Sequence, residues 1–262
     1  MAGRKLILAN MMVPCMVLVL ASSSLIITVA QDHPQTLEVG HGCSPDTYRY
    51  VNETAFQDNL DTAFASLASN ISPSNASFFA TSVSNEGNTD AVYALLLCRK
   101  YLTSQECFQC FTAAENRLKQ FCSNEGYNGG RIYMDGCLLR YENNTFFDQG
   151  TDGGNSSLCG SAYDTNPKEF NQTADMLLSQ LITTASSSDG YAEEVASKAS
   201  ITLYGVAQCV PTLSTATCQD CLKGAQTLVN SCLPQQEGRG LQGGCFMRYA
   251  TSPLYDNFNS SK

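Results

Sequence analysis

The sequence predicts an α+β fold: two tandem copies of a small disulfide-rich domain, each an antiparallel sheet with two helices packed on one face. Three observations predict it. The chain begins with an apolar segment typical of secretion, it then repeats a pattern of six cysteines, and each copy contains two helical and several strand-like hydrophobic patterns. Helices and strands do not alternate strictly along the chain, which favours an antiparallel sheet over a parallel one.

Residues 1–30 have the pattern of a secretory signal peptide. The segment opens with the basic pair Arg4 and Lys5, continues almost wholly apolar, and ends on small residues at Ala30, as signal peptidase requires. An uncleaved anchor is the alternative, because a stretch of this length could also span a bilayer. Either topology places the rest of the chain outside the cytoplasm. No later stretch could span a membrane, so we expect a secreted, soluble mature chain.

The predicted mature chain is acidic. Two of the 15 basic residues fall in the signal segment, which leaves 13 basic against 24 acidic residues, a net charge of -11. Such a surface repels phosphate backbones and anionic lipids, so we do not expect nucleic acid or a membrane surface as a partner. Residues 31–42, ahead of the first domain, are predicted to form a mobile tail.

Cysteine spacing gives the strongest sign of an internal duplication. Cys15 lies in the signal segment, and the other twelve of the 13 cysteines form two blocks that share the motif C-x8-C-x2-C. A turn-rich polar stretch separates them, which predicts a first domain over 43–148, a linker over 149–158 and a second domain over 159–258. The two blocks are Cys43, Cys98, Cys107, Cys110, Cys122 and Cys137, and then Cys159, Cys209, Cys218, Cys221, Cys232 and Cys245.

Hydrophobic periodicity is similar in the two copies. Apolar residues at helical spacing predict two helices in each, and short apolar or alternating runs predict strands that end in a closing hairpin. The helical ranges are 56–71, 104–121, 170–185 and 214–232, and the strand-like ranges are 78–83, 91–98, 131–134, 136–141, 201–209 and 241–249.

Residues that enzyme chemistry requires are missing from both predicted domains. The only histidines, His33 and His41, precede the first domain cysteine, so neither domain can build a Ser-His-Asp unit, a Cys-His unit or a histidine metal site. The two C-x-x-C pairs lie too far apart for a zinc ribbon, and an oxidising compartment favours structural disulfides. A carboxylate pair for glycoside hydrolysis is not duplicated, because Ala250 stands in copy two where copy one has Glu142. We therefore predict no enzyme activity, no cofactor and no metal.

The mature chain fits a secreted, disulfide-bonded glycoprotein. Its even number of cysteines indicates a full set of disulfide bonds, although spacing alone leaves many pairings open within each block. Seven sequons are candidates for N-glycosylation. They begin at Asn52, Asn70, Asn75, Asn143, Asn155, Asn171 and Asn259.

The repeated C-x8-C-x2-C motif resembles the ginkbilobin-like (stress-antifungal) domain of land plants, and the resemblance covers almost all of the mature chain. Two such domains behind a signal peptide are similar to the cysteine-rich repeat secretory proteins. The resemblance implies that the first cysteine of each block pairs with the fifth, the second with the third, and the fourth with the sixth. The implied bonds are Cys43–Cys122, Cys98–Cys107, Cys110–Cys137, Cys159–Cys232, Cys209–Cys218 and Cys221–Cys245.

A carbohydrate site is implied by the same resemblance. The founding antifungal member binds mannose through Asn, Arg and Glu side chains, and copy one carries Ser44, Arg131 and Glu142 at the matching positions. A guanidinium and a carboxylate suit sugar hydroxyls, because each can take two hydrogen bonds. The corresponding residues of copy two are Gly160, Arg239 and Ala250.

An alternative role for the two arginines is structural. Arg131 and Arg239 are retained in both copies although the Glu is not, so each could pair with a carboxylate and hold its closing hairpin. The chain has no Trp for stacking on a sugar, and Tyr133 and Tyr141 are the candidates to replace it. A glycan on Asn143 would lie next to the site.

Two functional hypotheses follow for a non-enzymatic, secreted plant defence or stress protein of the apoplast. In the first, copy one binds mannose or a cell-wall glycan weakly, in keeping with an antifungal role. In the second, the protein is an extracellular protein-interaction module that acts with a receptor or a cell-wall protein and binds no sugar. The matching residues in copy one favour the first hypothesis, and their loss in copy two favours the second.

Overall fold

A computed structural model describes residues 34–44, 52–71, 76–84, 90–151, 154–256 and 258. The predicted signal peptide and the sequons at Asn75 and Asn259 lie outside these residues. Both cysteine blocks belong to one unit, residues 32–262. Among the described residues, no helix has the length and apolar character needed to cross a membrane.

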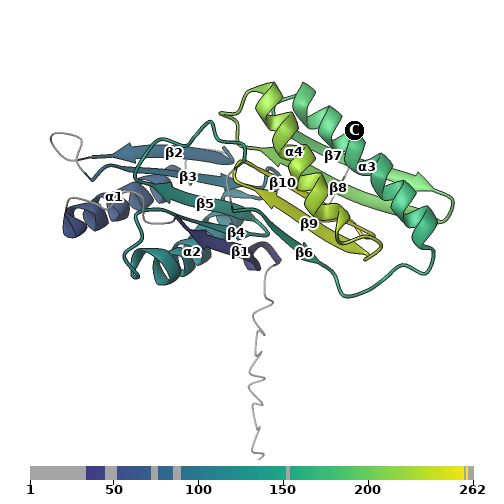
Figure 1. The fold of residues 1–262 in the computed structure, drawn as a ribbon, viewed down its shortest axis with the longest axis horizontal. Coiled ribbons are helices and arrows are strands. Elements are labelled where there is room, and N and C mark those ends of the chain that lie inside the picture. Colours follow the sequence, from purple (N-terminus) through teal and green to yellow (C-terminus); the bar gives the residue numbers. More distant parts are fainter. Residues whose placement is uncertain are drawn as a thin grey trace, which may run out of the picture. The chain divides into compact units, whose positions relative to one another are not determined.

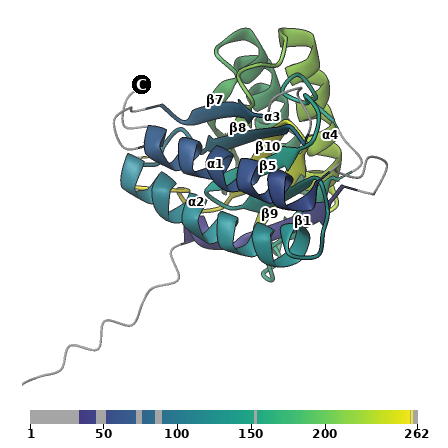
Figure 2. The same cartoon turned by 90° about the vertical axis from the view of Figure 1, so that its left-hand side faces the viewer.

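Repeat 1 is a five-stranded antiparallel sheet with strand order β1-β4-β5-β3-β2. Helices α1 and α2 lie side by side across one of its faces, where α1 packs on β2 and β3 and α2 packs on β4 and β5 (Figure 2). The elements are η1 (Pro34–Thr36), β1 (Glu38–Cys43), α1 (Glu53–Ile71), β2 (Phe78–Val83), β3 (Val92–Cys98), α2 (Ser104–Leu118), η2 (Lys119–Ser123), β4 (Gly130–Met134) and β5 (Cys137–Glu142).

Repeat 2 has the same architecture, with strand order β6-β9-β10-β8-β7 and helices α3 and α4 across one face (Figure 1). The predicted α+β class, with two copies of an antiparallel sheet and two helices on one face of each, is confirmed. The elements are β6 (Ser156–Cys159), α3 (Pro167–Ser187), β7 (Tyr191–Lys198), β8 (Ile201–Cys209), α4 (Thr215–Asn230), β9 (Glu237–Gln242) and β10 (Cys245–Ala250).

The first strand of each repeat differs from the sequence-based prediction. Residues 34–42 were expected in a mobile tail, yet 38–43 form β1, which pairs antiparallel with β4. Likewise β6 takes up the end of the predicted linker and pairs with β9. Both are edge strands with Gly, Ser or Glu and few β-formers, so their backbone hydrogen bonds to a neighbouring strand define them, rather than local propensity.

The helix starts are encoded by local capping residues. Thr103 Oγ1 accepts a hydrogen bond from the backbone N–H of Glu106 at 3.2 Å, and Glu106 Oε2 accepts one from the backbone N–H of Thr103 at 2.8 Å. This reciprocal capping box satisfies two amides that the helix leaves unpaired. Ser214 caps α4 by one hydrogen bond, which its side chain accepts from the backbone N–H of Thr217 at 3.2 Å.

Each sheet has one face toward its helices and one face free of helices. In β5, Leu139 and Tyr141 belong to the core beneath α1 and α2, whereas Leu138 belongs to a different cluster. Because side chains alternate along a strand, Arg140 and Glu142 lie on the same helix-free face as Leu138. Repeat 2 follows the same rule, with Met247 toward the helices and Phe246 away from them.

The helix-free faces of the two repeats share a buried apolar cluster, which we call the joint. Its members come from β3, β4, β5 and the turn after β5 in repeat 1, and from β8, the residue after it, β9 and β10 in repeat 2. Burial of apolar surface from both sides makes the two repeats one structural body. The buried members are Leu95, Leu97, Tyr133, Leu138, Phe146, Val206, Val210, Leu241 and Phe246.

Six disulfide bonds connect the twelve cysteines, and each bond stays within one repeat. They are Cys43–Cys122, Cys98–Cys107, Cys110–Cys137, Cys159–Cys232, Cys209–Cys218 and Cys221–Cys245, the pairs that the resemblance implied. The two cysteines of each C-x-x-C motif belong to different bonds, so neither motif forms a redox dithiol pair. The bonds instead tie α2 and α4 to their sheets.

Candidate functional site

The structure places Ser44 and Glu142 side by side at one end of the sheet of repeat 1. Ser44 Oγ donates a hydrogen bond to Glu142 Oε2 at 2.7 Å, and the backbone N–H of Ser44 donates to the carbonyl of Gly129 at 2.9 Å. Gly129 leaves the room that this contact needs, because a Cβ there would lie 2.0 Å from Glu142 Oε2 and 2.7 Å from Ser44 Oγ. A side chain at position 129 would therefore separate the pair.

Glu142 is also held by an arginine that the sequence did not single out. Arg140 Nε donates to Glu142 Oε1 at 2.9 Å, and the side chains are 6% and 7% exposed. The guanidinium of Arg140 lies over the ring of Phe146 at 4.2 Å and donates to Gln149 Oε1 at 3.0 Å. Both carboxylate oxygens of Glu142 thus have a donor within the protein, as a buried charge requires.

Arg131 lies on the same face but contacts the linker. In the register of the sheet it stands opposite Arg140 on β5 and opposite Gly42 on β1. A Cβ on Gly154 would lie 1.6 Å from the terminal nitrogen of Arg131, so the guanidinium packs directly on the linker backbone. Tyr133 donates to the carbonyl of the same Gly154 at 2.7 Å. The linker therefore covers Arg131 and Tyr133.

Neither tyrosine proposed for sugar stacking presents its ring to solvent. Tyr133 is 2% exposed and lies in the joint, and Tyr141 is fully buried beneath the helices of repeat 1. The hydroxyl of Tyr141 donates to the carbonyl of Tyr127 at 3.0 Å. The expectation that either ring stacks on a sugar is wrong, because alternation along β4 and β5 directs both rings into apolar clusters.

In repeat 2, Arg239 pairs with a carboxylate of the other repeat. Its guanidinium donates from Nε to Asp135 Oδ1 at 2.7 Å and from a terminal nitrogen to Asp135 Oδ2 at 2.8 Å. Arg248 donates to the same Oδ2 at 2.9 Å. Asp135 is 1% exposed and lies in the turn between β4 and β5 of repeat 1. The structural alternative for Arg239 is thus realised twice, across the joint with Asp135 and within its own hairpin, where a terminal nitrogen of Arg239 lies 2.7 Å from Glu237 Oε1.

Arg99 and Gln208 make further polar contacts in the joint. The guanidinium of Arg99 lies 3.5 Å from the centre of the Phe246 ring and donates from Nε to the carbonyl of Asp135 at 2.9 Å. Burial lowers the pKa of Arg99 to about 10. Gln208 of repeat 2 donates to the carbonyl of Cys98 at 3.0 Å and accepts from the backbone N–H of Lys100 at 3.3 Å.

The sequence did not predict the polar contacts between the two repeats. The residues that make these contacts are Asp135, Arg99, Gln208 and Arg248. One signal was present, since Asp135 corresponds to Gly243 in copy two and so breaks the internal symmetry. A carboxylate that occurs in one copy alone fits a contact in which the two repeats play different parts. Composition and spacing could not name its partners, which lie more than a hundred residues away in the chain.

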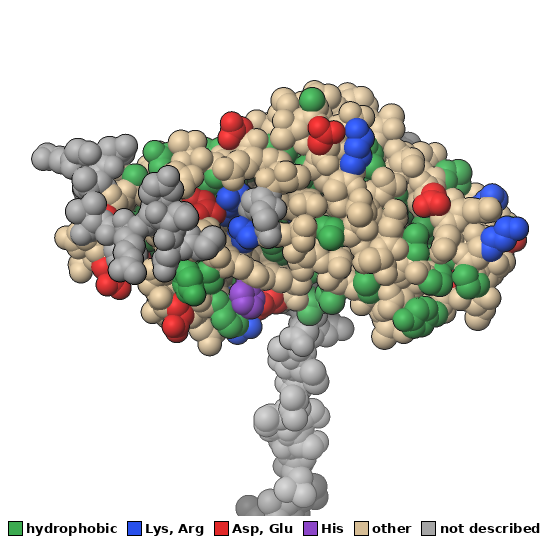
Figure 3. Space-filling model, in the orientation of Figure 1, with side chains coloured by type: hydrophobic (Ala, Val, Ile, Leu, Met, Phe, Trp, Pro, Cys, Tyr) green, Lys and Arg blue, Asp and Glu red, His purple; other side chains and the backbone are tan. Residues whose placement is uncertain are grey.

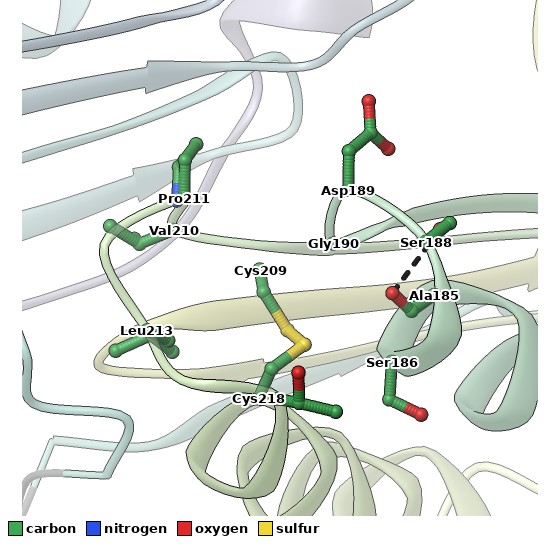
Figure 4. A pocket seen from close by; sticks show the side chains of 11 residues that line it. Ala185, Ser186, Ser188, Asp189, Gly190, Cys209, Val210, Pro211, Leu213 and Cys218 are labelled. Carbon is green, nitrogen blue, oxygen red and sulfur yellow. Dashed lines mark hydrogen bonds between the residues drawn. A yellow bond between two sulfur atoms is a disulfide. The ribbon is translucent and has the colours of Figure 1, made fainter.

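The structure contains a pocket of about 240 Å³ in repeat 2, between the end of α3 and the start of α4. Figure 4 shows the Cys209–Cys218 disulfide among the lining residues, with Leu213 and Pro211 to one side of it. The hydroxyl of Ser188, which also lines the pocket, lies 3.2 Å from the carbonyl oxygen of Ala185 and 2.9 Å from that of Tyr191. Within the described part of the chain, no cluster of His, Cys, Asp and Glu could hold a metal ion.

The described sequons differ in exposure. Asn52, Asn70 and Asn155 are exposed, whereas Asn143 and Asn171 are partly buried. On the face shown in Figure 3, acidic and basic side chains are scattered rather than gathered into one patch. That distribution gives no electrostatic footprint for nucleic acid on this face.

Two disulfide-bonded repeats joined through their helix-free faces define a tandem α+β module. The sequence matches the family described as salt stress response/antifungal twice, over residues 42–144 and 158–252. The chain belongs to this family, and the resemblance inferred from the cysteine motif is confirmed.

Relatives and a solved structure agree with this assignment. Cysteine-rich receptor-like protein kinase 2 of Arabidopsis thaliana is 33% identical over 241 residues, which cover 90% of this chain but 35% of that protein. Cysteine-rich repeat secretory protein 38 of the same plant is 30% identical over 82% of this chain and 84% of its own length. The crystal structure of the tandem DUF26 ectodomain of Arabidopsis PDLP8 superimposes with a TM-score of 0.66 at 29% identity, covering 82% of this chain and 98% of that one. The chain is therefore of a module type that occurs in secreted and receptor-like extracellular proteins.

Proposed function

We propose that the protein is a non-enzymatic module of the plant apoplast that acts in defence or stress responses by binding another extracellular protein. One observation favours protein binding over sugar binding: the side chains that would bind a sugar already contact other residues of the chain. Glu142 accepts from Ser44 and Arg140, and Arg131 packs under the linker at Gly154. A sugar would have to replace charge-assisted hydrogen bonds that are already made.

The joint supports the same proposal. Because the two repeats share a buried cluster, their outer surfaces keep a fixed spacing and orientation, which favours recognition of a large, shaped partner over a single sugar ring. The use of this module in a relative named as a receptor-like kinase is in keeping with protein recognition.

A binding survey tests this proposal. The full secreted chain, with its disulfides intact, would be immobilised and presented with a panel of purified receptor ectodomains and cell-wall proteins, and separately with a glycan array. We expect saturable binding to a protein and none to the array. A chain whose bonds have been reduced and alkylated is the control. Saturable binding to a glycan alone would contradict the proposal.

Weak mannose binding in repeat 1 is the second candidate, and the contact between Ser44 and Glu142 favours it. If these side chains bind a hexose, the affinity should be on the order of millimolar, since a hydroxyl offers fewer hydrogen bonds than an amide. Ser44→Asn should then strengthen mannose-dependent chemical-shift changes, and Arg131→Ala should abolish them. Glu142→Gln should weaken the changes, and Glu125→Gln, at an exposed carboxylate in a turn, is its matched control. Absence of any shift change in both wild type and Ser44→Asn would rule this candidate out.

A further inference from the structure

Two tyrosines from different repeats stack on one another at the edge of the joint. Tyr101 follows β3 in repeat 1, and Tyr255 lies in the C-terminal segment after β10 in repeat 2. Their ring centres are 4.4 Å apart and the ring planes differ by 10°. Both rings are partly exposed, so the pair is accessible from solvent. This geometry brings carbons of the two rings close together.

A carboxylate stands at the phenol of Tyr255. Glu193 Oε1, on β7, accepts hydrogen bonds from the hydroxyls of both Tyr255 and Tyr191. Phe258 packs against Tyr255 with ring centres 5.2 Å apart and holds the segment in place. The position of Tyr255 is thus fixed by a hydrogen bond on one side and by aromatic contacts on the others.

The ionisation state of the pair determines how it would react. Burial raises the pKa of Tyr101, and burial together with Glu193 raises the pKa of Tyr255, so both phenols are neutral at extracellular pH. A neutral phenol that loses an electron must also lose its proton. The Glu193 carboxylate is already hydrogen-bonded to that proton and can receive it.

We propose that Tyr101 and Tyr255 form a site of oxidative cross-linking, in which hydrogen peroxide and a haem peroxidase couple the two rings into dityrosine. Each phenol loses one hydrogen atom, as an electron and a proton, and the two phenoxyl radicals join through the ring carbons next to the hydroxyl-bearing carbons. The two ring hydrogens then move to the oxygens and restore the phenols. Peroxide accepts the two electrons and two protons and becomes two molecules of water, and the protein loses two hydrogen atoms.

The bond would add a connection that the disulfides do not supply. All six disulfides close loops within one repeat, so the linker backbone is the covalent connection between the repeats. A Tyr101–Tyr255 bond would fix repeat 1 to the C-terminal segment of repeat 2. The modification would therefore lock the joint in an oxidising environment, which is the environment that the disulfides themselves require.

Peptide mapping of the full chain tests the proposal. The purified, deglycosylated protein would be treated at low concentration with hydrogen peroxide and a plant haem peroxidase, then reduced and cleaved with trypsin. We expect dityrosine fluorescence, an intact monomer mass lower by two hydrogen atoms, and a cross-linked pair of the peptides 101–117 and 249–262. Because the second peptide also contains Tyr249, fragmentation must place the bond at Tyr255.

Matched variants separate geometry from simple exposure. Tyr101→Phe and Tyr255→Phe keep the ring stack but remove one phenol, so each should abolish the intramolecular product. Tyr163→Phe is the control, because Tyr163 is 64% exposed and would be the first target if exposure alone decided. Glu193→Gln keeps an acceptor but cannot take the proton, and should slow the coupling several-fold.

Several results would overturn the proposal. They are cross-links only through Tyr163, a product that forms only as a dimer at high protein concentration, or a wild-type chain without the 101–117 to 249–262 pair under conditions that couple free tyrosine. If a Phe variant failed to fold, the wild-type peptide map alone would still decide the question.

Discussion

Replacing Asp135 with asparagine should weaken the joint more than any other single polar change. The carboxylate is 1% exposed and accepts three hydrogen bonds, two from Arg239 and one from Arg248, whose side chains are 6% and 11% exposed. Asparagine keeps the shape but removes the charge, which leaves two buried guanidiniums without their full counter-charge. Removing one partner of a buried ion pair costs about 3–5 kcal/mol. Glu237 also pairs with both arginines and offsets part of that loss, so we expect about 3 kcal/mol.

Unfolding in guanidinium chloride, followed by two independent probes of structure, is the appropriate assay. In the wild type, the shared cluster couples the repeats, and one cooperative transition is expected. Asp135→Asn weakens the contacts between the repeats, and every disulfide bond lies within one repeat. The single unfolding transition should therefore separate into two. Asp220→Asn is the control, because its pair with Lys223 is exposed and a change there should stay within about 0.5 kcal/mol. A single transition with a loss below about 1 kcal/mol in Asp135→Asn would refute the reasoning.

Three further predictions concern bonds, pH and packing. Cys110→Ser should divide the single thermal transition into two, with repeat 1 unfolding at the lower temperature, because the lost bond to Cys137 lies within repeat 1; one shared transition on differential scanning calorimetry would contradict this. The hydrogen bond from Lys100 lowers the pKa of Asp189 below its usual 3.8. This pair across the joint should therefore add at most about 1 kcal/mol to the free energy of unfolding above pH ~4, and the contribution should be lost as the pH falls below that value. Asp189→Asn should remove this step from the curve of stability against pH. Gly240→Ala should lower the stability by about 1–3 kcal/mol, because the added Cβ would lie 2.3 Å from a backbone oxygen. Gly154→Ala should lower it less, because the added Cβ meets the flexible guanidinium of Arg131, which can move. Equal unfolding midpoints of the two variants would count against this prediction.

Local patterns were enough to predict much of the fold. The helix starts at Ser104 and Thr215 lie within a residue of the predicted ones, because caps such as Thr103 act on amides three residues away. Strand β1 was not predicted, since Glu-Val-Gly-His-Gly-Cys has little β-propensity and is held by its pairing with β4.

The candidate site was predicted only in part. The sequence named Ser44, Arg131 and Glu142, and the structure joins the first and the last by a hydrogen bond. It did not name Arg140, which neutralises Glu142 from two residues away on the same strand face. An arginine in a strand otherwise apolar is a signal that could have been read, because a buried guanidinium needs a carboxylate nearby.

The sequence by itself determined the duplication, the disulfide-bonded character of the chain, and the two helices and closing hairpin of each repeat. These follow from spacing and periodicity, which act over a few residues or recur between the copies. Only the tertiary structure decided that the helix-free faces meet, that Asp135 belongs to Arg239 of the other repeat, and that the linker covers Arg131. Alternation along a strand shows that a face is apolar but not what covers it, because the partner of such a face is set by the packing of distant segments.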